Sequence, residues 1–134
     1  MTEFASTRLN RPAEEPMADK TYNTLMEFWP FYLSEHADLR NRVLHFVGST
    51  LVLVLVALSI VQANPWYLVG APFAGYGFAW VGHFFVERNR PATFTYPVWS
   101  FICDWIMYFY IWTGQIGKQM EKHGIVEKTA QSAA

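Results

Sequence analysis

The stretch RVLHFVGSTLVLVLVALSIVQANPWYLVG (Arg42–Gly70) decides the fold. An apolar run comes first, then the dipeptide Asn64-Pro65, which is typical of a turn, and then a second apolar run. No Asp, Glu, Lys or Arg occurs between Val43 and Val86. Because about 20 apolar residues cross the hydrocarbon core of a bilayer, this segment predicts two antiparallel transmembrane helices joined by a tight turn. We expect these helices at about residues 40–61 and 66–87.

Two further apolar segments flank this hairpin. The composition is 52% hydrophobic and 18% aromatic, and aromatic residues are dense in residues 22–33, which include Pro30. Trp and Tyr rings favour the membrane interface, so residues 22–33 predict an N-terminal interfacial helix. The run from Tyr96 to Trp112 predicts a third apolar helix. The expected fold class is therefore an all-α, multi-pass helical membrane protein.

Polar composition marks both ends of the chain. Residues 1–20 contain prolines and acidic side chains and predict a disordered tail. Residues 118–134 predict a polar C-terminal tail, which leaves a single membrane-embedded helical domain at 21–117. The formal net charge of −1 provides no basic field that would attract nucleic acid.

Arginines flank the hairpin at one end only. Arg40, Arg42, Arg88 and Arg90 lie close to the outer ends of the two apolar runs, whereas the turn between the runs has no Lys or Arg. The positive-inside rule therefore places the N-terminus and the loop at 88–90 in the cytoplasm. A third span would carry the C-terminal lysines across the membrane, which the same rule disfavours. Whether residues 96–112 are re-entrant, lie flat at the membrane surface or cross the membrane fully stays open.

Three of the four histidines are expected at one level of the membrane. His45 lies 19 residues before Asn64, and His83 lies 19 residues after it. At a rise of 1.5 Å per residue, both imidazoles are roughly 28 Å from the turn, close to the thickness of the hydrocarbon core. His36 is on the same side of the bilayer, whereas His123 falls in the polar tail. The hairpin thus predicts that His36, His45 and His83 converge at the cytoplasmic boundary.

An acidic side chain joins this predicted group. Glu87 follows His83 by four residues, a spacing that places both side chains on one face of an α-helix. Imidazole suits iron, zinc, copper and nickel, and histidines with a carboxylate and open positions are the pattern of non-haem Fe(II) oxygenases. The residues alone are equally compatible with histidines that only form interfacial hydrogen bonds and with Glu87 as a cytoplasmic anchor.

Three more charged residues have two interpretations each. Arg88 and Arg90 are candidates to bind a substrate carboxylate through forked hydrogen bonds, and they also suit positive-inside anchoring. Asp104 lies within an apolar run, where an ionised carboxylate is costly. It is therefore either a functional group or a hydrogen-bonding partner in helix packing.

Two segments of the chain resemble a known family. FYLSEHADLRNRVLHFVGS (Phe31–Ser49) and GFAWVGHFFVERNRPATFTYPVWS (Gly77–Ser100) are similar to the two sequence blocks of the 2-hydroxy fatty acid dioxygenase family. The motifs that carry the resemblance are H-x8-H and G-H-x3-E-x2-R-P-A, and the similarity covers about residues 22–112. Members are small membrane proteins, and the characterised eukaryotic member shortens a 2-hydroxy fatty acid by one carbon through Fe(II)-dependent α-oxidation.

The resemblance implies a function and a set of site residues. His36, His45 and His83 would bind Fe2+, and Glu87 and Arg90 match the acidic and R-P-A positions of the motif. For the mechanism we expect Glu87 to be a ligand or catalytic base, and Arg88 or Arg90 to neutralise the substrate carboxylate. The substrates would be a 2-hydroxy fatty acid and O2. The compact chain without organelle signals suggests a bacterial plasma membrane. Two other classes stay open: a non-enzymatic lipid-binding or assembly protein, and a zinc-dependent membrane hydrolase.

Overall fold

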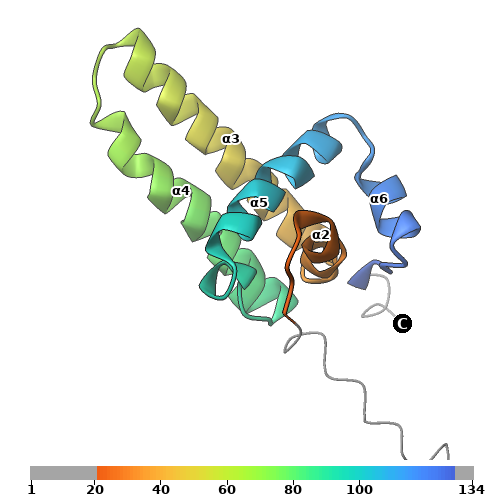
Figure 1. Cartoon of the computed structure of the whole chain (residues 1–134). Coiled ribbons are helices and arrows are strands. Elements are labelled where there is room, and N and C mark those ends of the chain that lie inside the picture. The colour runs from red at the N-terminus through yellow and green to blue at the C-terminus, as the bar shows by residue number, and fades with distance from the viewer. Residues whose placement is uncertain (1–20, 129–134) are drawn as a thin grey trace, which may run out of the picture.

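The computed structural model describes residues 21–128, and within that part every regular element is helical (Figure 1). In chain order the elements are α2 (Leu25–Ser34), α3 (Leu39–Val61), α4 (Tyr67–Val81), the π-helix η2 (Gly82–Glu87), the 3-10 helix η3 (Ala92–Phe94), α5 (Pro97–Trp112) and α6 (Ile116–Lys122). The predicted all-α class is confirmed. The tail predicted for residues 1–20 lies outside the described residues.

Helices α3 and α4 lie side by side as a hairpin, in agreement with the expected turn (Figure 1). In this turn Ala63 has a left-handed backbone with φ 50°, and the Asn64 side chain accepts a backbone hydrogen bond at 3.0 Å. The helices approach closely where Gly48 of α3 faces α4. A Cβ on Gly48 would lie 3.0 Å from the carbonyl oxygen of Ala74 and 3.0 Å from Phe78 Cβ. A glycine at the contact therefore sets the spacing of the hairpin.

One helix in the described part of the chain is long and apolar enough to cross a membrane. This helix is α3, with 23 residues and a mean hydropathy of 2.4 in its most apolar window. The second span expected at 66–87 is divided, because α4 ends at Val81 and the chain continues directly as η2. Helix α5 has 16 residues, fewer than the roughly 20 that cross the hydrocarbon core. Length and composition thus identify a single candidate span.

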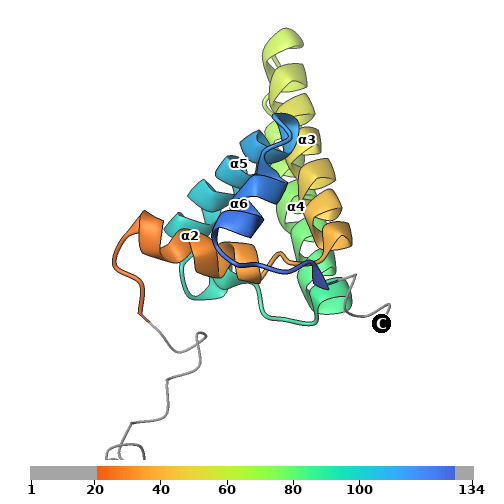
Figure 2. The same ribbon diagram turned by 90° about the vertical axis from the view of Figure 1, so that its right-hand side faces the viewer.

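The N-terminal helix is present, but its aromatic face is buried within the protein. Helix α2 continues through Pro30 and lies with α5 and α6 beside the base of the hairpin (Figure 2). Its rings pack on one another and on α5 and α6 in a core made of Tyr22, Phe28, Trp29, Phe31, Tyr32, Leu33, Ala92, Cys103, Met107 and Met120. These rings are thus buried on the apolar surface that α5 and α6 provide, and the placement of this helix at a membrane interface stays a prediction.

Residues 116–128 return to the helical body. Helix α6 places Met120 in the core, where it is 6% exposed. Beyond α6, the Glu127 carboxylate pairs with Arg42 at 2.8 Å, and the backbone N–H of Lys128 donates to Ala37 O at 3.1 Å. Residues 118–128, the described part of the predicted polar C-terminal tail, thus contact the helical body through Met120, an ion pair and a backbone hydrogen bond. The domain boundaries stay predictions.

Substitution of Gly48 tests the close helix contact. We expect Gly48→Ala to lower the free energy of unfolding by about 1–3 kcal/mol, because its Cβ meets the backbone of α4. Unfolding in detergent, followed by circular dichroism, measures the change. Gly77→Ala is the matched control, since nothing lies within 4 Å of a Cβ at that position. Equal loss of stability in both variants would contradict the contact.

Candidate metal centre

Three buried histidines from three separate elements meet at the base of the hairpin. His36 lies in the loop between α2 and α3, His45 lies in the second turn of α3, and His83 lies at the start of η2. Their ring centroids are 4.4, 4.5 and 5.0 Å apart, and they offer ligand atoms that all lie within 4.8 Å of one another. The three residues are only 1%, 6% and 3% exposed. The structure thus brings together the histidines that the hairpin geometry predicts.

Two of the imidazoles are oriented by hydrogen bonds from Nδ1 to backbone carbonyls. His36 Nδ1 lies 2.7 Å from Tyr32 O, and His45 Nδ1 lies 2.9 Å from Asn41 O. A carbonyl oxygen only accepts hydrogen bonds, so each Nδ1 atom carries the hydrogen and donates. In a neutral ring, Nε2 then has no hydrogen and presents a lone pair.

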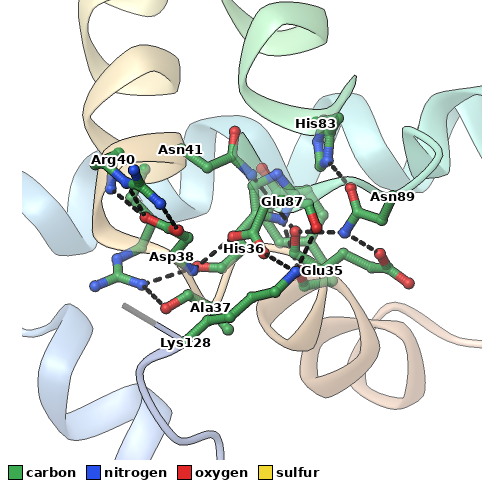
Figure 3. A network of polar contacts seen from close by, with 12 residues as sticks. Glu35, His36, Ala37, Asp38, Arg40, Asn41, His83, Glu87, Asn89 and Lys128 are labelled. Atoms are coloured by element: carbon green, nitrogen blue, oxygen red, sulfur yellow. Dashed lines mark hydrogen bonds and ion pairs between the residues drawn. The ribbon is translucent and has the colours of Figure 1, made fainter. Parts of the chain in front are cut away.

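The third imidazole has the same tautomer, and Asn89 sets it. His83 Nδ1 lies 2.7 Å from Asn89 Oδ1. The amide nitrogen of Asn89 donates to Glu35 O at 3.0 Å and also to the Glu35 carboxylate, as Figure 3 shows. These two bonds fix the amide so that its oxygen faces the ring. His83 Nδ1 is therefore a donor, and its Nε2 is free of hydrogen.

The resulting arrangement fits a metal ion. His36 Nε2 and His45 Nε2 are 3.1 Å apart, and with neither atom protonated they form no hydrogen bond and their lone pairs repel. Two imidazole nitrogens bound to one ion at about 2.1 Å are separated by roughly 3.0–3.4 Å, so the observed spacing suits a shared cation. Hydrogen bonds from the outer ring nitrogen to oxygen acceptors are also what orients metal-bound histidines. The residues present thus match a tri-imidazole metal site.

Burial keeps this site in the protonation state that a metal requires. Removal of water lowers the pKa of His36 well below its usual value, and the neighbouring imidazoles lower that pKa further. A neutral ring is the form that binds a metal ion. The Tyr32 ring stacks on His36 with centroids 4.0 Å apart. Burial also raises the pKa of the Tyr32 hydroxyl, which therefore stays protonated and donates to Asp104.

The π-helix η2 presents His83 to the other two rings. Such segments, with hydrogen bonds between residues five apart, are rare and occur frequently at functional sites. Gly82 allows η2 to approach α3, because a Cβ there would overlap the Asn41 side chain. Arg88 ends the segment in a left-handed conformation with φ 59°, and Asn89 N donates to His83 O at 3.0 Å. This bend folds Asn89 back to the His83 ring.

Glu87 belongs to a different network (Figure 3). Its carboxylate is buried, accepts from Asp38 N at 2.5 Å and lies 3.3 Å from Lys128 Nζ. Within residues 21–128 the candidate ligand group contains three histidines and no carboxylate. We expected His83 and Glu87 on one face because residues four apart share a face in an α-helix. Residues 82–87 instead form a π-helix, in which this spacing no longer aligns the two side chains. A catalytic role for Glu87 stays a prediction, and its contacts instead hold the loop that carries His36.

Arg88 and Arg90 are exposed at the surface next to this centre. They border a broad, open depression together with Phe84, Phe85 and Phe94, and the Arg90 guanidinium lies 5.2 Å from the centre of the Phe94 ring. The histidines do not line this depression. The arrangement resembles a basic and aromatic membrane anchor, and the predicted binding of a substrate carboxylate stays a prediction.

Asp104 borders the histidine centre from α5. It lines a small internal space together with His36, His45 and His83, and it accepts the hydrogen bond from Tyr32. The sequence identifies Asp104 as an isolated acidic residue in an apolar run, but it does not predict that Asp104 lies beside the histidines. It gives no signal for Tyr32, Glu35 or Asn89, because an aromatic residue in an aromatic segment and polar residues in polar loops are unremarkable. His123 ends α6 and is not part of the group.

Fold and site together define the class as a small helical protein with a buried tri-histidine centre. The model of the family described as 2-hydroxy-palmitic acid dioxygenase Mpo1-like matches residues 22–116. The chain belongs to this family, as its two motifs predict, and the matched region contains all three histidines. Neither the curated proteins nor the solved structures include a significant match to the chain.

Asn89 offers a test of the centre that leaves every histidine in place. We expect Asn89→Ala to weaken metal binding about 10–100-fold, because the His83 ring loses the acceptor that fixes its tautomer. Competition with a chromophoric chelator measures the affinity. The exposed Asn23→Ala is the matched control and should bind as the unchanged protein does. An unaltered affinity in Asn89→Ala would show that His83 needs no such orientation.

Proposed function

We propose that this protein is an Fe(II)-dependent dioxygenase that shortens 2-hydroxy fatty acids by one carbon. The observation that carries the proposal is the convergence of three buried, neutral imidazoles in a chain whose family is described as a 2-hydroxy-palmitic acid dioxygenase. Imidazole suits Fe(II), and three protein ligands leave open positions for substrate and O2. When bound, the iron would supply the activation of O2.

The proposed reaction balances with O2 as the only oxidant. The bond between C1 and C2 of R–CHOH–COOH breaks, C1 leaves as CO2, and C2 becomes the carboxyl carbon of R–COOH. One molecule of O2 is consumed and one molecule of water is formed, so no further reductant is needed. The chain itself would provide a water-poor site and a polar edge at Asp104 and Tyr32, where the head group of the acid would lie.

The charged residues near the centre have supporting roles in this proposal. Arg88 and Arg90, exposed beside the centre, would attract the anionic head group toward it from the water boundary. Glu87 would hold the loop around His36 through Asp38 and Lys128.

The hairpin is proposed to insert into a membrane with its base at the cytoplasmic surface. Helix α4 and η2 form one continuous segment that has no charged residue before Glu87, as a second span requires. Many large apolar side chains on the hairpin are exposed, among them Leu51, Leu53, Val54, Ile60, Val61, Trp66 and Phe73. Arginines gather at the base, in agreement with the positive-inside rule. Placement in a bacterial plasma membrane stays a prediction.

A zinc-dependent hydrolase is the second candidate, because three histidines with an open fourth position are also a common catalytic zinc site. The two candidates differ in oxygen consumption. A zinc enzyme would retain activity without O2, whereas the proposed dioxygenase would consume one O2 for each CO2 released.

Metal analysis and oxygen uptake with 2-hydroxypalmitate test the proposed function. His45→Gln and His83→Gln are expected to lose stoichiometric iron and all oxygen uptake, because each removes one of three ligands. His123→Gln is the matched control and should keep both, since this histidine lies outside the centre. Circular dichroism checks that each variant is folded. Full oxygen uptake in folded His45→Gln or His83→Gln would overturn the proposal.

A further inference from the structure

An apolar cavity of about 370 Å³ lies beside the histidine centre, between α3, α4 and α5. Most of its wall is aliphatic or aromatic, and polar groups are provided by His45, Ser49, Asp104, the hydroxyl of Tyr76 and the indole of Trp105. This volume is in the range of small-molecule sites, which bury an apolar ligand body and orient it with a few polar groups.

The cavity adjoins the histidine centre at one end. His45 and Asp104 line both this cavity and the small space around the three histidines. Three small residues of α4, namely Ala71, Gly75 and Ala79, recur every four positions and form one side of the cavity. Larger side chains on this face of the helix would fill the space. The stripe of small residues is thus the reason that an open channel leads away from the histidines.

The length of the cavity suits an extended chain. Its wall follows α4 from Ala79, beside the histidines, to Leu68, one residue after the start of the helix. These positions are eleven residues apart, which corresponds to roughly 16 Å along a helix. Ala71 lies about 12 Å from the inner end on the same scale.

We propose that this cavity holds the alkyl tail of the 2-hydroxy acid, with the head group at the histidine centre and the far part of the tail between Ala71 and Leu68. The assignment rests on the proposed function of the centre. A single channel with one polar end matches an amphiphile with one tail, because the carboxylate and hydroxyl need the polar end and the tail needs the apolar wall. The face of α4 then determines which tail lengths are bound well.

Ala71→Leu tests this assignment by filling the far half of the channel. Oxygen uptake with 2-hydroxypalmitate is expected to fall about 10–200-fold, the effect of misfit in an apolar pocket. Uptake with 2-hydroxyhexanoate should be unchanged, because its short tail does not reach Ala71. Ala57→Leu, the same substitution at an exposed position of α3 outside the cavity, is the matched control. If folded Ala71→Leu loses oxygen uptake equally with both acids, or loses none with either acid, the assignment is overturned.

A binding measurement tests the position of the alkyl tail independently of the proposed oxidation. A 2-hydroxypalmitate analogue with a photoreactive group at the end of its tail is expected to label residues 68–72 in the full-length protein. Labelling confined to the outer face around Phe73 or Phe109 would overturn the assignment. If residues 68–72 are labelled but no 2-hydroxy acid is oxidised, the cavity assignment stands and the proposed dioxygenase activity fails. If the protein oxidises 2-hydroxy acids and Ala71→Leu does not alter its preference for their chain length, the cavity assignment fails and the proposed activity stands.

Discussion

The repulsion between unprotonated Nε2 atoms is the constraint on which the whole site depends. Each ring donates a hydrogen bond from Nδ1, two of them to backbone carbonyls and one to the amide oxygen of Asn89. The three Nε2 atoms therefore present their lone pairs in a small buried volume. Water is excluded and protonation of His36 is suppressed by burial, so a bound cation is the chemically consistent way to stabilise the cluster. Fold elements around the site serve mainly to keep these donors and acceptors in place.

Those elements are positioned by close contacts of backbone and small side chains. Gly48 brings α3 against α4, and Gly82 brings η2 against Asn41, so His45 and His83 face each other across the hairpin. The return of the chain at residues 127–128 fixes the loop that carries His36, through Arg42 and Ala37. Other small residues, on α4, leave the cavity beside the centre. The candidate metal centre and the proposed channel for the alkyl tail thus both lie at this one pair of helices.

The sequence predicts the parts of this arrangement that depend on regular spacing. The charge-free segment and Asn64-Pro65 predict a hairpin, and equal distances from the turn place His45 and His83 at one level. The π-helix could not be foreseen, because its extra residue per turn comes from packing at Gly82 and from the left-handed Arg88. The same holds for the docking of residues 116–128 and for the burial of the α2 rings, which follow from tertiary contacts and not from composition.

The most direct test of the account is X-ray absorption spectroscopy of the full-length protein loaded with Fe(II). The predicted spectrum contains three imidazole ligands, loses one of them in His36→Gln, and is unchanged in Glu87→Gln, since Glu87 faces the network of Asp38 and Lys128. A first shell with fewer than three imidazoles, or one that changes when Glu87 is replaced in a folded protein, would contradict the tri-histidine centre.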